Sequence, residues 1–201
     1  MKKLIGPMAV AVLLCAVLLF GYKQKSGNAL PTDYPLDLLF TSGAGAWGTC
    51  MTLESDGAFA GEYHDTDMGD SGEGYPNGTV YVCSFSGRFE DFTQINRHSY
   101  SLTLVELSSD YEEGKEWFEG GVRYVSAEPY GVEDGREFIL FLPDTPTSEL
   151  SETFLSWWPG RFSPETQKDT LSVYGLYNVK MGYGFFAEPH LREAETHNFK
   201  K

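Results

Sequence analysis

The sequence predicts an all-β fold: an antiparallel meander barrel of about eight strands, with one short helix near residues 148–158, after an N-terminal hydrophobic helix. Three observations predict it. Apolar and polar residues alternate with period two in many segments after residue 30, aromatic residues make up 15% of the chain, and its 22 glycines often fall between these segments. Such spacing is typical of a barrel, and a two-sheet sandwich is the alternative.

The first 29 residues have the order of an export signal. Lys2 and Lys3 precede an uncharged run at residues 4–22, close to the roughly 20 residues that an α-helix needs to cross a bilayer. Two outcomes stay open. A peptidase could cut near Ala29 and release a secreted protein, or the run could remain as a membrane anchor. We favour the anchor because the apolar run is long for a signal sequence.

Residues 30–201 are therefore expected to form one extracytoplasmic domain at the cell membrane, held by a single pass with the C-terminal domain outside. This part contains all 29 acidic residues and 11 of the 15 Lys and Arg residues, so its net charge is −18. Such a surface repels nucleic acids and anionic lipid headgroups. It leaves cationic partners as candidates, besides the membrane that residues 4–22 would enter.

The clearest structural unit is a hairpin at residues 47–64. A three-residue loop at residues 55–57 pairs Leu53 with Phe59 and keeps the apolar side chains on one face, whereas a two-residue loop would place a carboxylate beside Phe59. The three-residue loop is a type I turn with a bulge, in which Gly57 takes the left-handed conformation.

The other elements follow the same reasoning from periodicity and turn residues. Further strands are expected at residues 36–41, 79–87, 99–107, 121–127, 137–143, 171–179 and 182–188. The helix would be capped by Thr147 or Ser148 and ended by residues 159–160, a Pro-Gly pair. The charged stretch at residues 108–116 is interpreted as a solvated loop.

Gly45-Ala46-Trp47 and the hairpin that follows resemble the opening of lipocalin-like (calycin) β-barrels, where a Gly-x-Trp begins the first barrel strand. The resemblance implies that Trp47 closes the barrel floor and that a cup holds a small or apolar ligand. The ligand-binding candidates are then Trp47, Met51, Phe59 and Tyr63.

A loop rich in acids follows this hairpin. Asp65, Asp67, Asp70 and Glu73 could supply oxygen ligands to calcium, although the spacing fails the EF-hand pattern. A solvated turn, with the acids splayed into water, is the reading we favour. Zinc is less favoured because His64 is the one nearby nitrogen ligand.

Cys50 and Cys83 could form a disulfide in an oxidising compartment. If the strand at residues 79–87 pairs with the one at residues 58–64, the two cysteines lie two strands apart. That separation is about 9.6 Å, beyond the roughly 7 Å that a bridge allows between Cα atoms. We therefore favour separate cysteines.

No nucleophile, metal-hydrolase or cofactor motif occurs in the sequence, so we expect a non-enzymatic protein with no catalytic residues and no cofactor other than possible calcium. Three functions are considered: a barrel that binds a small or apolar ligand in its cup, an interaction module for a protein or wall polymer with a filled core and an acidic loop face, and a hydrolase. Trp117-Phe118 and Trp157-Trp158 could form a carbohydrate platform, but core packing is the interpretation we favour for them.

Overall fold

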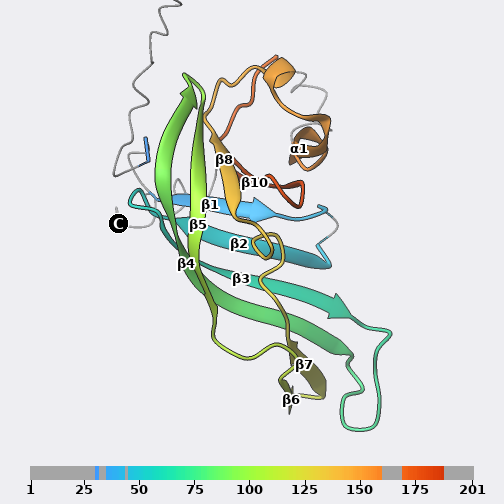
Figure 1. The fold of residues 1–201 in the computed structure, drawn as a ribbon. Coiled ribbons are helices and arrows are strands. Elements are labelled where there is room, and N and C mark those ends of the chain that lie inside the picture. Colours follow the sequence, from blue (N-terminus) through green and yellow to red (C-terminus); the bar gives the residue numbers. More distant parts are fainter. Residues whose placement is uncertain (1–29, 32–34, 44, 160–168, 188–201) are drawn as a thin grey trace, which may run out of the picture.

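The computed structural model describes residues 30–31, 35–43, 45–159 and 169–187, so the predicted N-terminal helix and cleavage site lie outside it. Within these residues, eight antiparallel strands close into a barrel, which confirms the predicted fold class (Figure 1). The barrel strands, in their order around the barrel, are β1 Leu36–Phe40, β2 Trp47–Leu53, β3 Ala58–Asp67, β4 Thr79–Asn96, β5 Ser99–Ser109, β8 Glu137–Phe141, β9 Gly175–Asn178 and β10 Tyr183–Ala187.

The predicted register of the β2–β3 hairpin is confirmed. Leu53 pairs with Phe59, and the N–H of Glu54 donates to the carbonyl oxygen of Ala58 at 2.8 Å. Gly57 has a φ of 90°, and a Cβ atom there would lie 2.2 Å from the carbonyl oxygen of Phe89. The loop therefore requires glycine both for its backbone conformation and for its contact with β4.

Strand β4 is longer than predicted and has three neighbours. It pairs with β3 and β5 in the barrel, and its first four residues also pair in parallel with β7 (Val122–Ser126). Strand β6 (Glu116–Glu119) pairs with β7, and this outer hairpin extends the sheet beyond the barrel (Figure 1). The prediction of a loop at residues 108–116 was therefore wrong at both ends, because β5 extends to Ser109 and Glu116 begins β6.

Side chains fill the barrel interior. The most deeply buried large residues include Phe40, Phe89, Phe138 and Phe185. Some core rings pack directly against the backbone of a neighbouring strand. At Gly61 in β3, for example, an added Cβ atom would lie only 2.5 Å from the Phe85 ring. Such close contacts are typical of a densely packed core.

One end of the barrel is closed by the segment between β7 and β8, residues 127–136, which we call the plug. Asn178 Nδ2 donates to the carbonyl oxygen of Gly131 at 3.0 Å, and Val132 is fully buried in the core. Gly131 has a φ of 101°, and a Cβ atom there would lie 2.7 Å from the Phe40 ring. The plug is therefore packed into the barrel and not laid loosely over it.

The predicted helix is present but shorter. A 3-10 turn at Thr147–Glu149 precedes α1, Glu152–Ser156, and the N-cap is Ser151, whose Oγ accepts from the N–H of Phe154 at 3.1 Å. The predicted caps at residues 147–148 were wrong because the chain first makes the 3-10 turn. Phe154 packs against Phe186 with ring centroids 4.8 Å apart, so α1 covers the outer side of β10.

No helix within the described residues is long and apolar enough to span a membrane.

Candidate functional site

Aromatic rings gather beneath the plug, around Phe40. Its ring centroid lies 5.0 Å from that of Trp47, 4.9 Å from that of Trp157 and 5.5 Å from that of Tyr130. Trp157 also donates its indole N–H to the carbonyl oxygen of Gly182 at 2.9 Å. Trp47 and Trp157 therefore help to pack this end of the barrel.

The four predicted ligand-binding residues have two kinds of surroundings. Met51 is 2% exposed and Phe59 is 4% exposed, both inside the main core. Trp47 and Tyr63 are partly buried at the edge of that core, near the plug. Contact with a ligand stays a prediction for all four, and Trp47 and Tyr63 are the two that a bound molecule could reach without displacing core side chains.

The inner face of the sheet continues past the plug. Thr49, Tyr63 and Cys83 are paired across β2, β3 and β4, and the buried positions of Thr49 and Cys83 show that this row points inward. Two residues further along β3, Asp65 pairs with Tyr81 and has the same orientation. The carboxyl group of Asp65 and the phenol group of Tyr81 therefore lie on the inner face of the sheet, just beyond the apolar core.

The plug adds a buried carboxyl group to this face. Glu133 Oε2 is buried and has no hydrogen-bond partner among the described residues. Burial raises the pKa of Glu133, with smaller contributions from the carboxylates of Glu128 and Asp134, against the opposing effect of the backbone N–H groups of Glu133 and Gly131. Ionised Glu133 therefore lacks the neutralising partner that a buried charge normally has.

Two tyrosines lie beside this carboxyl group. The ring centroids of Tyr63 and Tyr130 are 5.6 Å apart. Burial raises the pKa of Tyr63 to about 12, aided by the charges of Asp65 and Glu133. Burial and a hydrogen bond with Tyr183 raise the pKa of Tyr130. Both phenols therefore stay protonated at neutral pH and can donate hydrogen bonds.

We call this surface the acid–tyrosine face and define it by Tyr63, Asp65, Tyr81, Glu128, Tyr130 and Glu133. No ion pair within the described part of the chain involves its three carboxyl groups. Two cations at this end of the molecule pair with other acids: Lys180 Nζ lies 3.3 Å from Asp134, and Arg123 contacts Asp70 and Glu116. The carboxyl groups of the face thus form no ion pair with a described cation.

Three of the four predicted calcium ligands have other surroundings in the structure, and the fourth, Glu73, is exposed. Asp67 Oδ1 accepts from the N–H of Gly69 at 2.8 Å, Asp70 pairs with Arg123, and Asp65 lies on β3. Strand β3 continues to Asp67, so the loop begins later than predicted. The described residues contain no group of three or more His, Cys, Asp or Glu side chains placed to hold a metal ion. Calcium binding stays a prediction.

Cys50 and Cys83 lie two strands apart, because β3 separates β2 from β4. Cys50 is exposed on the outer face and Cys83 is buried on the inner face, where its Sγ lies 3.4 Å from Ser109 Oγ. Burial raises the pKa of the Cys83 thiol. No disulfide joins them in this arrangement.

The outer face of the same strands carries a shallow depression of about 500 Å³, lined mainly by small side chains such as those of Cys50, Ala60, Ser84 and Ser86. The sheet separates it from the acid–tyrosine face.

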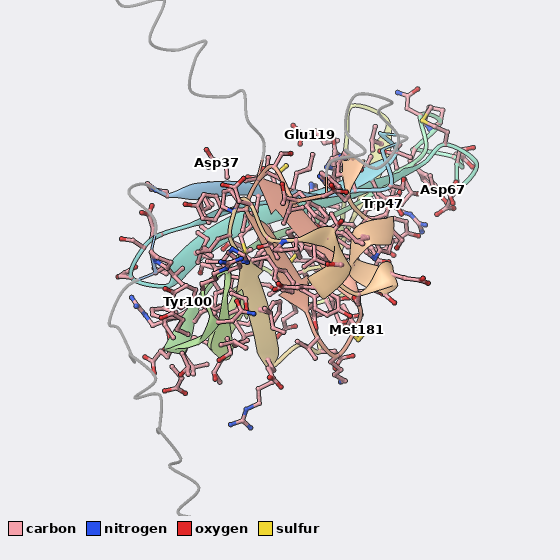
Figure 2. The ribbon with its side chains drawn as sticks, turned by 90° about the horizontal axis from the view of Figure 1, so that it is seen from above. Asp37, Trp47, Asp67, Tyr100, Glu119 and Met181 are labelled. Carbon is pink, nitrogen blue, oxygen red and sulfur yellow. The ribbon has the colours of Figure 1, made fainter. Side chains whose placement is uncertain are left out.

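The end of the molecule that carries the face is visible in Figure 2, where Trp47 and Asp67 lie toward one end and Asp37 and Tyr100 toward the other. Tyr63 and Asp65 are candidate site residues from the sequence alone, whereas Tyr81 and the plug residues are not. Residues 133–135, Glu-Asp-Gly, are typical of a turn, but turn chemistry does not show where a turn packs.

The chain matches no protein-family model, no curated protein and no solved structure. The resemblance to lipocalin-like barrels therefore stays a prediction beyond the barrel architecture itself.

Proposed function

We propose that residues 30–201 form a non-enzymatic, extracytoplasmic binding module with a filled core that holds a cationic partner on the acid–tyrosine face. One observation carries the proposal: Glu133 Oε2 is buried without a hydrogen-bond partner among the described residues, beside further acids that form no ion pair there. Residues 4–22 would tether the module to the membrane or direct its secretion.

One oxygen of the Glu133 carboxyl group, Oε2, is buried without a hydrogen-bond partner among the described residues, and this makes the ionised form unfavourable. A buried charge without a partner is unfavourable, so a cation that reaches Glu133 gains more there than at an exposed acid. The rings of Tyr63 and Tyr130 add a surface on which an ammonium or guanidinium group is attracted. The net charge of −18 would speed the approach of such a partner.

The cup for a small apolar ligand is the other function that the sequence favours. The position of Met51 and Phe59 within the packed core supports the binding module with a filled core over this alternative.

The test uses the full chain in detergent and a peptide of twelve lysines as the cationic probe. The variant Asp65→Asn, Glu128→Gln, Glu133→Gln removes the three carboxylates of the face. Isothermal titration should show binding at least about tenfold weaker than in the unchanged protein, because three charge contacts of some 0.5 kcal/mol each are lost.

A control variant makes the same change in net charge elsewhere. Asp91→Asn, Asp144→Asn and Glu152→Gln all alter exposed acids outside the face. Binding should then weaken by less than about threefold, the long-range effect of net charge alone. If both triple variants lost the same amount of affinity, binding of the peptide would depend on net charge alone, and the proposal would be wrong.

A further inference from the structure

The end of β5 is an open strand edge beside the acid–tyrosine face. β5 pairs with β8 only over residues 99–103, and the N–H of Leu104 then donates to the carbonyl oxygen of Arg136 at 2.8 Å. Residues 105–109 are all exposed, on both faces of the strand, although β4 pairs with their other edge. This stretch of the barrel wall therefore has a strand neighbour on one side only among the described residues.

The hydrogen-bond pattern shows which backbone groups the edge presents. The N–H of Asp110 donates to the carbonyl oxygen of Ser84 in β4 at 3.0 Å. Because direction alternates along an antiparallel strand, Ser108 and Glu106 also face β4, and Leu107 and Ser109 point their N–H and C=O groups to the open side. No described residue forms a hydrogen bond with these four groups.

The side chains of this edge are unusual for an exposed strand. Val105 is 45% exposed and Leu107 is 37% exposed. Natural sheets protect open edges with lysine, proline, bulges or a covering loop. Residues 105–109 contain no lysine and no proline, and the register irregularity near residues 88–89 and 104–106 precedes the open groups and leaves them accessible.

We propose that this edge binds an extended, basic segment of a partner protein, which adds to the sheet as a strand beside β5. The inference rests on the proposed function and names its partner class. The added strand would take the open groups of Leu107 and Ser109, and its apolar side chains would cover Val105 and Leu107.

The acidic residues near the β5 edge indicate that the added partner segment is basic. Glu106 lies within the edge, and its cross-strand neighbour Arg88 directs its guanidinium to Asp56, at 3.5 Å. Asp110 follows Ser109 and donates its N–H to Ser84. Ala127, the neighbour of Glu128, donates its N–H to Val82 two residues away on β4, so both acids lie at the same end. Lysine or arginine side chains alternating with apolar ones would meet these acids.

Among the described residues, β6 also has an open edge in this region. It spans four residues and carries a glutamate at each end, Glu116 and Glu119. Charged ends and a short length are devices that discourage strand addition, so β5 is the better acceptor.

The experiment titrates the full chain, in detergent, with a ten-residue peptide of alternating lysine and valine. A second peptide of the same sequence carries an N-methyl group on every residue, which removes the backbone hydrogen-bond donors of both edges and keeps the charge. We expect the methylated peptide to bind at least about tenfold more weakly, as expected for the loss of several backbone hydrogen bonds.

Two variants of one residue give an independent measurement. Leu107→Pro removes the open N–H group, and proline is tolerated where a strand N–H faces away from its neighbour. Leu107→Ala keeps the N–H group and shortens the side chain. We expect about a tenfold loss of affinity for Leu107→Pro and about a threefold loss for Leu107→Ala. If the proline variant does not fold, the two peptides still give the answer on the unchanged protein.

The outcomes separate the two proposals. Equal binding of both peptides, with loss in the triple variant Asp65→Asn, Glu128→Gln, Glu133→Gln, would overturn strand addition and leave the cationic partner in place. Failure of every cationic peptide to bind would overturn both.

Discussion

The hydroxyl group of Thr49 donates a 2.6 Å hydrogen bond to the carbonyl oxygen of Tyr130, and so joins the barrel wall to the plug across 81 positions of the sequence. Thr49 is fully buried, so water cannot replace its hydroxyl group easily. This contact places Tyr130 above the core and beside Tyr63. The acid–tyrosine face therefore depends on how the plug is held.

Loss of the Thr49 hydroxyl should destabilise the plug. Thr49→Val keeps the shape of the side chain and leaves the Tyr130 carbonyl without its donor, which should lower the free energy of unfolding by about 1–3 kcal/mol in urea denaturation. Thr52→Val is the control, because Thr52 is exposed and its hydroxyl group donates to the side chain of Asp37 on the surface. If both substitutions changed the free energy of unfolding equally, the hydrogen bond from Thr49 to the plug would stabilise the fold no more than a surface hydrogen bond.

A larger effect is expected at Gly131. Gly131→Ala places a methyl group 2.7 Å from the Phe40 ring at a φ of 101°, so it adds a steric clash to backbone strain. Gly114→Ala is a matched control with a φ of 77° and no atom within 4 Å of the added Cβ. Thermal unfolding should show Gly131→Ala to be less stable than the control by at least about 1 kcal/mol. Similar stabilities of the two variants would mean that the plug shifts to accommodate the methyl group without destabilising the fold.

The buried carboxyl group predicts a specific pH dependence. Because the folded pKa of Glu133 is raised above the ordinary value of 4.5, the unfolded chain ionises first as pH rises, and Glu133 then destabilises the fold. The contribution of protonated Glu133 to stability is fully present below pH 4.5, and it is lost as pH rises through the pKa of the folded state.

Glu133→Gln cannot ionise and provides the comparison. Its free energy of unfolding should exceed that of the unchanged protein at pH 7, and the difference should shrink as pH falls toward 4.5. Urea titrations of both proteins from pH 4 to pH 8 measure this difference. A difference that is constant across the range would show that the charge of Glu133 does not matter.

The helix cap provides a test of local structure. Ser151→Ala removes the hydroxyl that accepts from the N–H of Phe154, and should lower the free energy of unfolding by about 1 kcal/mol. Ser148→Ala alters one of the two residues that the sequence pattern predicts as a cap, which lies in the 3-10 turn, where no side chain caps the turn. It should change stability by less than about 0.5 kcal/mol. The opposite order would place the helix start at residue 148.

Local patterns predicted much of the barrel. The register of Leu53 against Phe59 followed from keeping apolar residues on one face, and the left-handed Gly57 followed from that register. The second half of β4 was missed because its irregularities near Asp91, which has a φ of 56°, interrupt the period-two pattern.

The site was only partly predictable for a different reason. Tyr63 and Asp65 follow from the hairpin, whereas Glu133 and Tyr130 reach the face only because the plug folds back into the barrel. The contacts that hold it there, from Thr49 and Asn178, join positions far apart in the sequence. Neither the periodicity of apolar residues nor the spacing of motifs in the sequence predicts such contacts.

Chemical-shift mapping of the full chain in detergent, titrated with the alternating lysine–valine peptide, tests the central claim most directly. We predict that the largest amide shifts fall on Asp65, Leu107, Tyr130 and Glu133 and that they saturate together. Shifts spread evenly over exposed acids elsewhere, such as Glu152, would contradict a cation-binding face at this end of the barrel.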